Sequence, residues 1–283
     1  MAPLVQTLAL LAMAMATTAV EVVNLDMALN SFDDQYQCCG PAMTAALPAL
    51  NNSEFEQNKK FAEVWGKAAA KVQSQGPPKS PLSTGQATAI MAFTMDDLSS
   101  VFNDAVHVAG SSSQEYRDNF HFKTLHFLLT NATVTLKNNL ERKCYDVSQE
   151  VCETQFKARE HEIVRFGNFT TMESSPLPGK CPEEGTVFQV HTCQGVDIKV
   201  YAANSETDGV LVLIPPFETF EVTKYTETGR KTEIELQSAG PFSKYQCEWQ
   251  KDHATGGSVP RATFHVGGLL LATTALAVAT GIL

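Results

Sequence analysis

The stretch GVLVLIPPFETFEV, residues 209–222, decides how the second half of the chain folds. Its first part, 210–214, is a run of aliphatic and β-branched residues, which favours a buried strand. Pro215 and Pro216 end that strand, because proline has no backbone N–H to give to a sheet. A second short strand is expected to begin at Phe217. The stretch therefore predicts two strands joined by a rigid turn.

A two-residue period on both sides of this stretch predicts further strands. Ile198 and Val200 alternate with polar residues in DIKVYA, and Ile234 and Leu236 do so in TEIELQ. The segment TVFQVHTC, residues 186–193, also has this character. The period begins at about residue 144. The second half of the chain is therefore expected to consist of short strands.

The first half of the chain has a helical period. Phe61 and Val64 recur at helical spacing in NKKFAEVWGKAAAKV, and Phe122, Leu125 and Leu129 share one face of residues 119–130. Helices that come first and strands that follow predict an α+β fold, with a mostly helical N-terminal part followed by a β-sheet core.

Both ends of the chain indicate export. Residues 1–19 carry no charge and end on small residues, which predicts a signal peptide, although the usual basic start is missing; a buried first helix is the alternative. Residues 266–283 are uncharged and apolar. They follow a spacer, 251–265, whose small residues Gly256, Gly257 and Ser258 suit the attachment of a lipid anchor. A membrane-spanning anchor, the alternative, would normally continue into Lys or Arg.

The cysteines and the net charge fit an exported chain. Seven cysteines without a CxxC pair indicate disulfides rather than a metal cluster, and the odd number leaves one thiol over. The sequons at Asn51, Asn131 and Asn168 predict N-glycosylation. A net charge of −10 argues against nucleic acid as a partner, because a phosphate-binding surface is basic.

Common catalytic motifs do not fit this sequence. His161-Glu162 is followed by IVR, so the second histidine of a zinc-binding HExxH is missing. His121 and His126 are five residues apart and face different sides of a helix. Neither a GxSxG elbow nor a phosphate-binding glycine loop occurs. These residues alone predict an exported, disulfide-bonded α+β domain.

Four blocks of sequence carry a resemblance to a known family: NSFDDQY (30–36), AMTAALP (42–48), FKTLHFLLT (122–130) and VLIPPFETFEV (212–222). Together they resemble the vertebrate ecto-ADP-ribosyltransferases, which are lipid-anchored cell-surface enzymes that transfer ADP-ribose from NAD to protein arginine. The resemblance implies one domain over residues 20–250 with a mixed β-sheet core. It also implies NAD as substrate, arginine-bearing extracellular proteins as acceptors, and a GPI anchor in the outer leaflet of the plasma membrane.

The resemblance also implies a disulfide pattern. One bridge of the family joins the N-terminal segment to the last strand, here Cys39 to Cys247, and another corresponds to Cys144 with Cys193. In the chain-entropy model, closing such loops stabilises a fold by roughly 3–5 kcal/mol each. The remaining pair, Cys152 and Cys181, is expected to form a third bridge, which leaves Cys38 free.

Catalysis in the family uses an arginine that holds the NAD pyrophosphate, a serine near the nicotinamide ribose, and a glutamate that stabilises the developing oxocarbenium ion. Here these positions hold Gln149, Thr171 and Leu211. A neutral amide cannot replace a guanidinium against pyrophosphate, and Glu150 is expected to add a negative charge beside it. Gln149, Thr171 and the nearby Arg165 are the residues expected to face NAD.

The loop before Leu211 is about two residues longer than is usual in the family, so Glu206 and Asp208 are candidates for a displaced carboxylate. Two functions follow. The first is a working transferase or NAD glycohydrolase that uses Thr171 with Glu206 or Asp208. The second is a catalytically lapsed surface protein that acts by binding. A third interpretation, which sets the resemblance aside, is an exported adhesion-like domain.

Overall fold

The computed structural model describes residues 21–78, 81–95, 98–139, 141, 143–174, 179, 181, 184–203 and 208–251. Several predictions from the sequence lie outside the described residues. They are the signal peptide at 1–19, the apolar tail at 266–283, the carboxylate of Glu206, and the anchor residues Gly256, Gly257 and Ser258. No helix in the described ranges is long and apolar enough to cross a membrane.

The first half of the chain is helical, as predicted. The helices are α1 (Gly40–Gln57), α2 (Lys59–Ser74), α3 (Thr84–Phe93), α4 (Leu98–Ala109), α5 (Ser113–Asp118) and α6 (Lys123–Asn139). Local sequence fixes their starts: the Asn58 side chain accepts from the backbone N–H of Phe61 to cap α2, and Ser83 and Gln86 form a capping box that opens α3. Phe61 and Val64 are buried on the inner face of α2.

Helix α6 lies at the centre of the helical part. Phe122, Leu125 and Leu129 are all buried, which confirms the predicted apolar face. The carboxylate of Glu54, from α1, accepts hydrogen bonds from the backbone N–H groups of Lys123 (2.5 Å) and Thr124 (3.0 Å). A carboxylate at this position satisfies N–H groups that have no partner within the helix and favourably opposes its dipole.

The strands lie in the second half of the chain, apart from β1 in the N-terminal segment. The strands are β1 (Glu21–Asn24), β2 (Tyr145–Cys152), β3 (Thr154–Lys157), β4 (Ile163–Val164), β5 (Thr170–Glu173), β6 (Gly185–Thr192), β7 (Val196–Asp197), β8 (Leu211–Ile214), β9 (Glu218–Thr228) and β10 (Lys231–Pro241). Eight of them have the order β4-β9-β10-β6-β2-β5-β8-β7, and β1 pairs with β3 in a small parallel ladder. Within the large sheet, β10 and β6 are parallel and the other pairs antiparallel. The α+β prediction is confirmed.

The double proline marks the place where the chain changes position within the sheet. β8 lies near one end of the strand order and β9 near the other, and Pro215 and Pro216 are buried between them. The backbone N–H of Glu218 donates to the carbonyl of Pro215 at 3.2 Å and closes the turn. Two residues that cannot extend the β8 ladder thus redirect the chain across the sheet.

The strand predicted for DIKVYA is wrong beyond its first residue. β7 ends at Asp197, and Lys199–Tyr201 is a 3-10 helix. The Asp197 carboxylate accepts from the backbone N–H of Lys199 at 2.9 Å, and the N–H of Tyr201 donates to the carbonyl of Ile198 at 2.8 Å. Aspartate favours this local turn over an extended ladder. Ile198 is buried as expected, whereas Val200 is 59% exposed.

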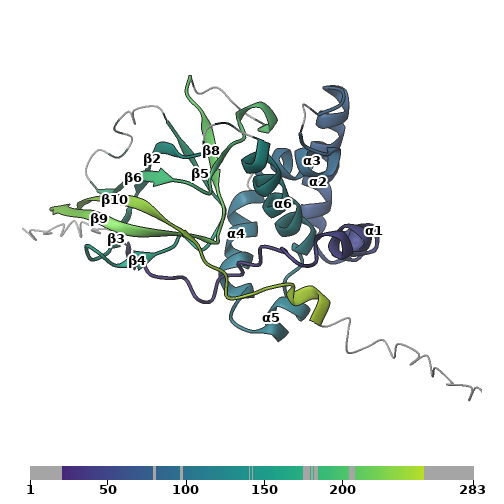
Figure 1. Ribbon diagram of the computed structural model, residues 1–283, viewed down its shortest axis with the longest axis horizontal. Coiled ribbons are helices and arrows are strands. Elements are labelled where there is room, and N and C mark those ends of the chain that lie inside the picture. The colour runs from purple at the N-terminus through teal and green to yellow at the C-terminus, as the bar shows by residue number, and fades with distance from the viewer. Residues whose placement is uncertain are drawn as a thin grey trace, which may run out of the picture.

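Two apolar clusters hold the layers together. The helical cluster joins buried side chains of α1–α6 to the underside of the sheet, where it includes Val196 and Leu213. The sheet cluster lies on the other face of β8 and includes Val212, Ile214 and Met172. The sheet and the helices form neighbouring layers, with α4 and α6 facing the strands (Figure 1).

The two ends of the domain are fastened to each other. The carboxylate of Asp33 accepts from the backbone N–H groups of Lys244 and Tyr245, and the carboxylate of Asp34 accepts from that of Glu248. The segments that carry these residues run side by side between α4 and α5 (Figure 1). The two aspartates of the motif NSFDDQY therefore position the C-terminal segment.

All three expected disulfides are present. Cys39–Cys247, Cys144–Cys193 and Cys152–Cys181 have Cα–Cα distances of 5.7, 4.1 and 5.3 Å. Among the cysteines in the described ranges, Cys38 is the one without a bridge, and it is exposed.

Candidate functional site

A cavity of about 1040 Å³, here called the cleft, opens between the N-terminal segment, helix α4 and the sheet. Its walls come from the segment 23–31, from α4, from β2 and β3, from the segment 162–171 that carries β4 and β5, and from Phe188 of β6. The sequence-predicted residues Gln149, Arg165 and Thr171 all line it. Segments more than 100 residues apart in the chain thus share one site.

Gln149 lies on the wall that β2 and β6 provide. It stands directly opposite Phe188 in the antiparallel register, so both side chains point to the same face of the sheet. The Phe188 ring packs against those of Phe156 (5.2 Å between centroids) and Phe166 (5.5 Å). These three rings, here called the aromatic wall, pack edge to face and give the cleft an apolar side.

Glu150 does not line the cleft, contrary to the expectation of a negative charge beside the pyrophosphate position. It lines a second hollow of about 740 Å³ on the opposite face of the sheet, together with Ser148, Gln189 and His191. The reason is the strand's two-residue period, which turns neighbouring side chains to opposite faces. The carboxylate is therefore separated from the cleft by the sheet itself.

Thr171 and Leu211 lie on adjacent strands but in different surroundings. Thr171 of β5 is paired with Leu213 of β8, and Glu173 is paired with Leu211. Thr171 lines the cleft, whereas Leu211 packs against the helical cluster and is not among the residues that line the cleft. Its backbone carbonyl accepts from the N–H of Ile198 at 2.8 Å. The first residue of β8 is thus a packing residue.

The displaced-carboxylate alternative rests on Asp208 and Glu206. Asp208 is exposed, and it is not among the described residues that line the cleft. Glu206 lies outside the described residues. Among the described residues, Asp208 is therefore not brought into the cleft with Thr171.

Arg165 lines the cleft, but its guanidinium group is buried and bonded to the segments beside the cleft. Nη1 donates to the Asp33 carboxylate at 2.5 Å, Nε donates to the carbonyl of Met27 at 2.7 Å, and Nη2 donates to that of Ala28 at 3.1 Å. The side chain has no exposed surface. Its expected role as a ligand of NAD is therefore replaced by another: Arg165 holds the N-terminal wall of the cleft in place.

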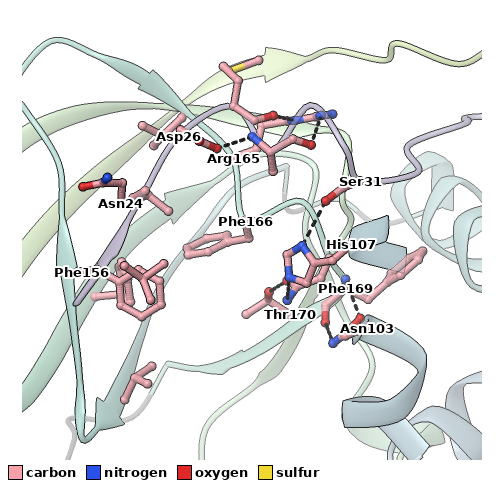
Figure 2. A pocket seen from close by; sticks show the side chains of 18 of the residues that line it. Asn24, Asp26, Ser31, Asn103, His107, Phe156, Arg165, Phe166, Phe169 and Thr170 are labelled. Atoms are coloured by element: carbon pink, nitrogen blue, oxygen red, sulfur yellow. Dashed lines mark hydrogen bonds between the residues drawn. The ribbon is translucent and has the colours of Figure 1, made fainter. Parts of the chain in front are cut away.

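His107 of α4 is a cleft residue that sequence reasoning did not single out. Its Nδ1 lies 3.1 Å from Oγ of Ser31 (Figure 2). Its Nε2 lies 3.3 Å from Nδ2 of Asn168. An amide NH₂ only donates, so Nε2 of His107 accepts this hydrogen bond. Nδ1 therefore carries the ring proton and donates it in a hydrogen bond to Oγ of Ser31. Burial lowers the pKa of His107, which favours this neutral form.

The cleft offers no free cation among its described lining residues. Its basic side chains are His107, which is neutral as argued above, and Arg165, which is paired with Asp33. Its acidic side chains are Asp26 and Glu162. Recognition of a diphosphate in proteins typically uses arginine or lysine, and the described lining offers neither with an unpaired charge.

The sequons have different surroundings. Asn168 lines the cleft, between β4 and β5. Asn51 lies in α1, and Asn131 lies in α6, where its Oδ1 accepts from the Gln86 amide at 2.5 Å. Neither of the latter two is among the residues that line the cleft.

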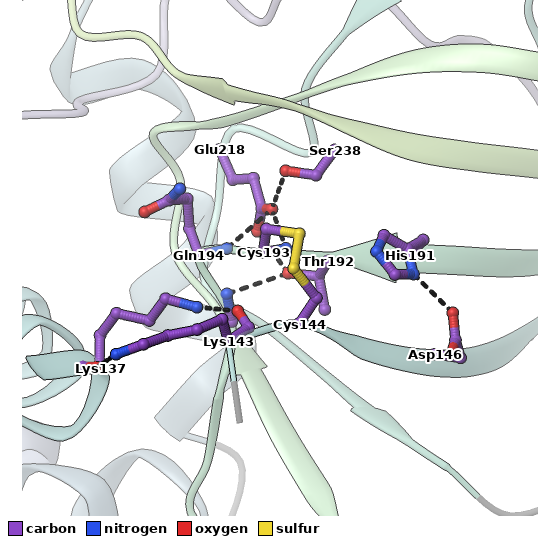
Figure 3. Close-up of a disulfide and its surroundings, with 11 residues drawn as sticks. Lys137, Lys143, Cys144, Asp146, His191, Thr192, Cys193, Gln194, Glu218 and Ser238 are labelled. Carbon is purple, nitrogen blue, oxygen red and sulfur yellow. Dashed lines mark hydrogen bonds and ion pairs between the residues drawn. A yellow bond between two sulfur atoms is a disulfide. The ribbon is translucent and has the colours of Figure 1, made fainter. Parts of the chain in front are cut away.

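A second polar cluster surrounds the Cys144–Cys193 disulfide (Figure 3). The buried carboxylate of Glu218 accepts hydrogen bonds from Thr192 Oγ1 (2.5 Å), Ser238 Oγ (2.7 Å), and the backbone N–H groups of Cys193 (2.7 Å) and Gln194 (2.9 Å). This glutamate comes two residues after Pro216 and fixes the turn after β6.

His191 stands near both sulfur atoms of that disulfide. The three side chains do not form a metal site, because disulfide sulfurs are not thiolate ligands. The expectation of disulfides in place of a metal cluster is consistent with this arrangement.

The sequence of the chain matches the model of a known protein family. The family model described as NAD:arginine ADP-ribosyltransferase matches residues 25–244, nearly all of the described domain. The chain belongs to this family.

Curated members of the NAD:arginine ADP-ribosyltransferase family resemble the chain throughout the domain. The erythroblast NAD(P)(+)–arginine ADP-ribosyltransferase of Gallus gallus is 44% identical over 240 residues, which cover 82% of this chain and 78% of the relative. The GPI-linked NAD(P)(+)–arginine ADP-ribosyltransferase 1 of Mus musculus is 39% identical and that of Homo sapiens 37%, each over 81% of this chain and, respectively, 74% and 75% of the relative.

A solved structure of the family has the same fold. The crystal structure of the eucaryotic mono-ADP-ribosyltransferase ART2.2 superposes with a TM-score of 0.67 at 28% identity, covering 80% of this chain and 98% of that protein. Mutants of ART2.2 have been solved in complex with NADH and with NAD. The fold and the family membership predicted from the sequence are confirmed.

Proposed function

We propose that this family member is a surface protein that acts by binding, and that its cleft does not support transfer of ADP-ribose at the rate typical of an enzyme. The observation that carries the proposal is the placement of Leu211. The family's catalytic glutamate stands at this position, and here the residue begins β8 and packs its side chain into the helical cluster. Thr171 alone of the expected groups retains a polar side chain suited to its role.

The charges of the cleft support the same proposal. Gln149 occupies the position of the family's pyrophosphate-binding arginine, and the guanidinium of Arg165 is committed to Asp33. Loss of one preorganised electrostatic group typically costs on the order of 10²–10³ in rate. Two such losses need not add fully, yet they remove several kcal/mol of transition-state stabilisation.

The test measures labelled ADP-ribose transfer from NAD to poly-arginine, together with nicotinamide release, by the protein produced without N-glycans. We expect no transfer above background from the unmodified protein and a measurable gain from the double variant Gln149→Arg, Leu211→Glu. The matched control is Gln189→Arg, the same change on the neighbouring strand but on the face that lines the second hollow. This control should gain nothing.

The competing function is a working transferase that relies on Thr171 and a displaced carboxylate. In that case the unmodified protein transfers ADP-ribose as fast as the double variant, and the proposal is wrong. The variant Asp208→Asn then shows whether Asp208 supplies the carboxylate. Calorimetric titration with NAD separates binding of NAD from its turnover. A cleft that binds NAD but does not turn it over has lost only the catalytic carboxylate.

We further propose that the chain is held at the cell surface by a GPI anchor attached near Gly256, Gly257 and Ser258. The GPI-linked relatives and the uncharged tail at 266–283 support this proposal. Release of the protein from intact cells by a phosphatidylinositol-specific phospholipase tests it. Protein that stays on the cells after this treatment contradicts the proposal.

A further inference from the structure

Asn168 occupies a fixed position at the wall of the cleft. It is preceded by Gly167, whose φ is +70° and where a Cβ would lie 2.4 Å from the Cβ of Ala28, so the backbone there is packed tightly against the N-terminal segment. It is followed by Phe169, whose ring is buried and whose backbone N–H and C=O both bond to the Asn103 side chain (3.2 and 2.9 Å). The loop is therefore held on both sides of Asn168.

The side chain of Asn168 is oriented as well. Its Oδ1 accepts from the hydroxyl of Thr170 at 2.6 Å, and its Nδ2 donates to Nε2 of His107 at 3.3 Å. The Nδ2 atom carries two hydrogens, and His107 uses only one of them. The other can be replaced by a substituent without loss of the bond to His107. Since Asn168, Thr170 and His107 all line the cleft, the substituent would begin at the cleft wall.

Asn168-Phe-Thr170 is an acceptor sequence for N-linked glycosylation. The structure also gives evidence for the compartment in which that reaction occurs, because three disulfides link the described domain and such bridges form along the secretory route. The nascent chain would thus meet a glycosyl donor before the cleft has formed.

We propose that Asn168 carries an N-linked glycan whose first sugar lies in the mouth of the cleft and closes it to solvent and to large ligands. In the attachment, a C–N bond forms between the Asn168 amide nitrogen and the anomeric carbon of a lipid-diphosphate-linked oligosaccharide. The sugar–phosphate bond breaks, the lipid diphosphate leaves, and the amide gives up one proton. This inference does not depend on whether the cleft transfers ADP-ribose.

The lining of the cleft suits a neutral sugar. The amide group of Gln149 can bond to hydroxyl groups, and the faces of Phe156 and Phe166 attract the partly positive C–H hydrogens of a sugar ring. In Figure 2 these two rings lie on one side of the hollow and the His107 cluster on the other. A neutral ligand also does not need a cation, and the described lining of the cleft has no unpaired one.

The first experiment determines occupancy. Protein secreted from eukaryotic cells is digested, and the peptide that contains Asn168 is examined by mass spectrometry before and after enzymatic removal of glycans. We expect this peptide to be glycosylated in most of the molecules. A peptide that is unmodified in the folded, secreted protein overturns the proposal.

The second experiment measures whether the glycan covers the cleft. Hydroxyl-radical footprinting reports the exposure of Met27 and Phe166, two half-buried residues of the cleft wall. Two variants remove the glycan in different ways: Asn168→Gln removes the acceptor, and Thr170→Val destroys the sequon but keeps Asn168 and its bond to His107. The matched control is Asn51→Gln, a sequon on α1 that does not line the cleft.

We expect the labelling of Met27 and Phe166 to rise several-fold in both cleft variants and to stay unchanged in the Asn51→Gln control. Trimming the wild-type glycan to a single sugar should leave the protection in place, because the first sugar provides it. Unchanged labelling in the correctly folded Thr170→Val variant overturns the proposal. Labelling that rises as much after trimming as in the variants overturns the role of the first sugar.

Discussion

The guanidinium of Arg165 and the carboxylate of Asp33 form an ion pair at 2.5 Å in which neither side chain has any exposed surface. The two residues are far apart in the sequence: Asp33 precedes helix α1, and Arg165 follows strand β4 in the wall of the cleft. Asp33 also accepts backbone hydrogen bonds from Lys244 and Tyr245. One buried pair thus joins the N-terminal segment, the cleft wall and the C-terminal segment.

Removal of one member of this pair should destabilise the fold strongly. Arg165→Met leaves the Asp33 carboxylate buried without its cation, and such a change typically costs about 3–5 kcal/mol. We expect that loss in the free energy of unfolding from urea titration. The exposed pair Lys224–Glu235, whose atoms lie 2.8 Å apart, is the control, and Lys224→Met should cost less than about 1 kcal/mol. Equal losses at the two sites would contradict the assignment of Arg165 to the fold.

The role of Arg165 could not be read from the sequence, because its partner Asp33 is 132 residues away and no spacing rule joins them. The resemblance to the family did predict that Gln149 and Thr171 share a site, and both residues line the cleft. For Glu150 the sequence held the answer: the two-residue period of β2 turns it away from Gln149. The turn at Asp197 depended on one side-chain hydrogen bond, which hydrophobic alternation does not report.

His126 should make the stability of the fold depend on pH. Burial is the main cause that lowers its pKa from 6.5 to about 3, and its ring accepts from the Tyr36 hydroxyl and donates to the carbonyl of Phe32. The depressed pKa means that the unfolded chain binds a proton that the folded chain excludes. The contribution of neutral His126 to the free energy of unfolding is therefore complete above pH 6.5. It is lost as the pH falls toward 3, by up to about 1.4 kcal/mol per pH unit.

The variant His126→Gln isolates this contribution. It should be less stable than the wild type at pH 7, because it loses aromatic packing in the core, but the difference should shrink as the pH is lowered from 6.5 toward 4. Chemical denaturation at a series of pH values provides the measurement. A difference that is constant over this range would show that His126 does not remain neutral in the fold.

Glu218 should give the opposite sign of pH dependence. Burial raises its pKa above 4.5, although its four hydrogen-bond donors act against the rise. Since the folded state holds this proton more tightly than the unfolded state, the contribution is complete below pH 4.5 and is lost as pH rises through the raised pKa. Relative to Glu218→Gln, which does not titrate, the wild type should therefore lose stability between pH 4.5 and 7.

The matched variant Glu218→Ala tests the hydrogen bonds themselves. It leaves the partly buried backbone N–H groups of Cys193 and Gln194 without an acceptor beside the Cys144–Cys193 disulfide, and each such group costs at most about 1–3 kcal/mol, the range for a buried one. Glu218→Gln keeps an oxygen at Oε1 and should be much milder. Similar losses for the two variants would show that the acceptor is dispensable.

Leu211→Glu, which returns the family's carboxylate, should reduce stability for two reasons. Leu211 packs against the helical cluster, so a carboxylate there loses apolar contacts and hydration. It also stands directly opposite Glu173, and like charges on paired residues repel. We expect a loss of about 1–3 kcal/mol at pH 7.

Addition of Glu173→Ser should recover part of this loss by removing the repulsion. The control Gln149→Arg, in the cleft, should change stability by less than about 0.5 kcal/mol. Urea denaturation of the three variants measures these differences. If Glu173→Ser recovers nothing, the two side chains do not face each other, and the pairing of β5 with β8 at this residue is wrong.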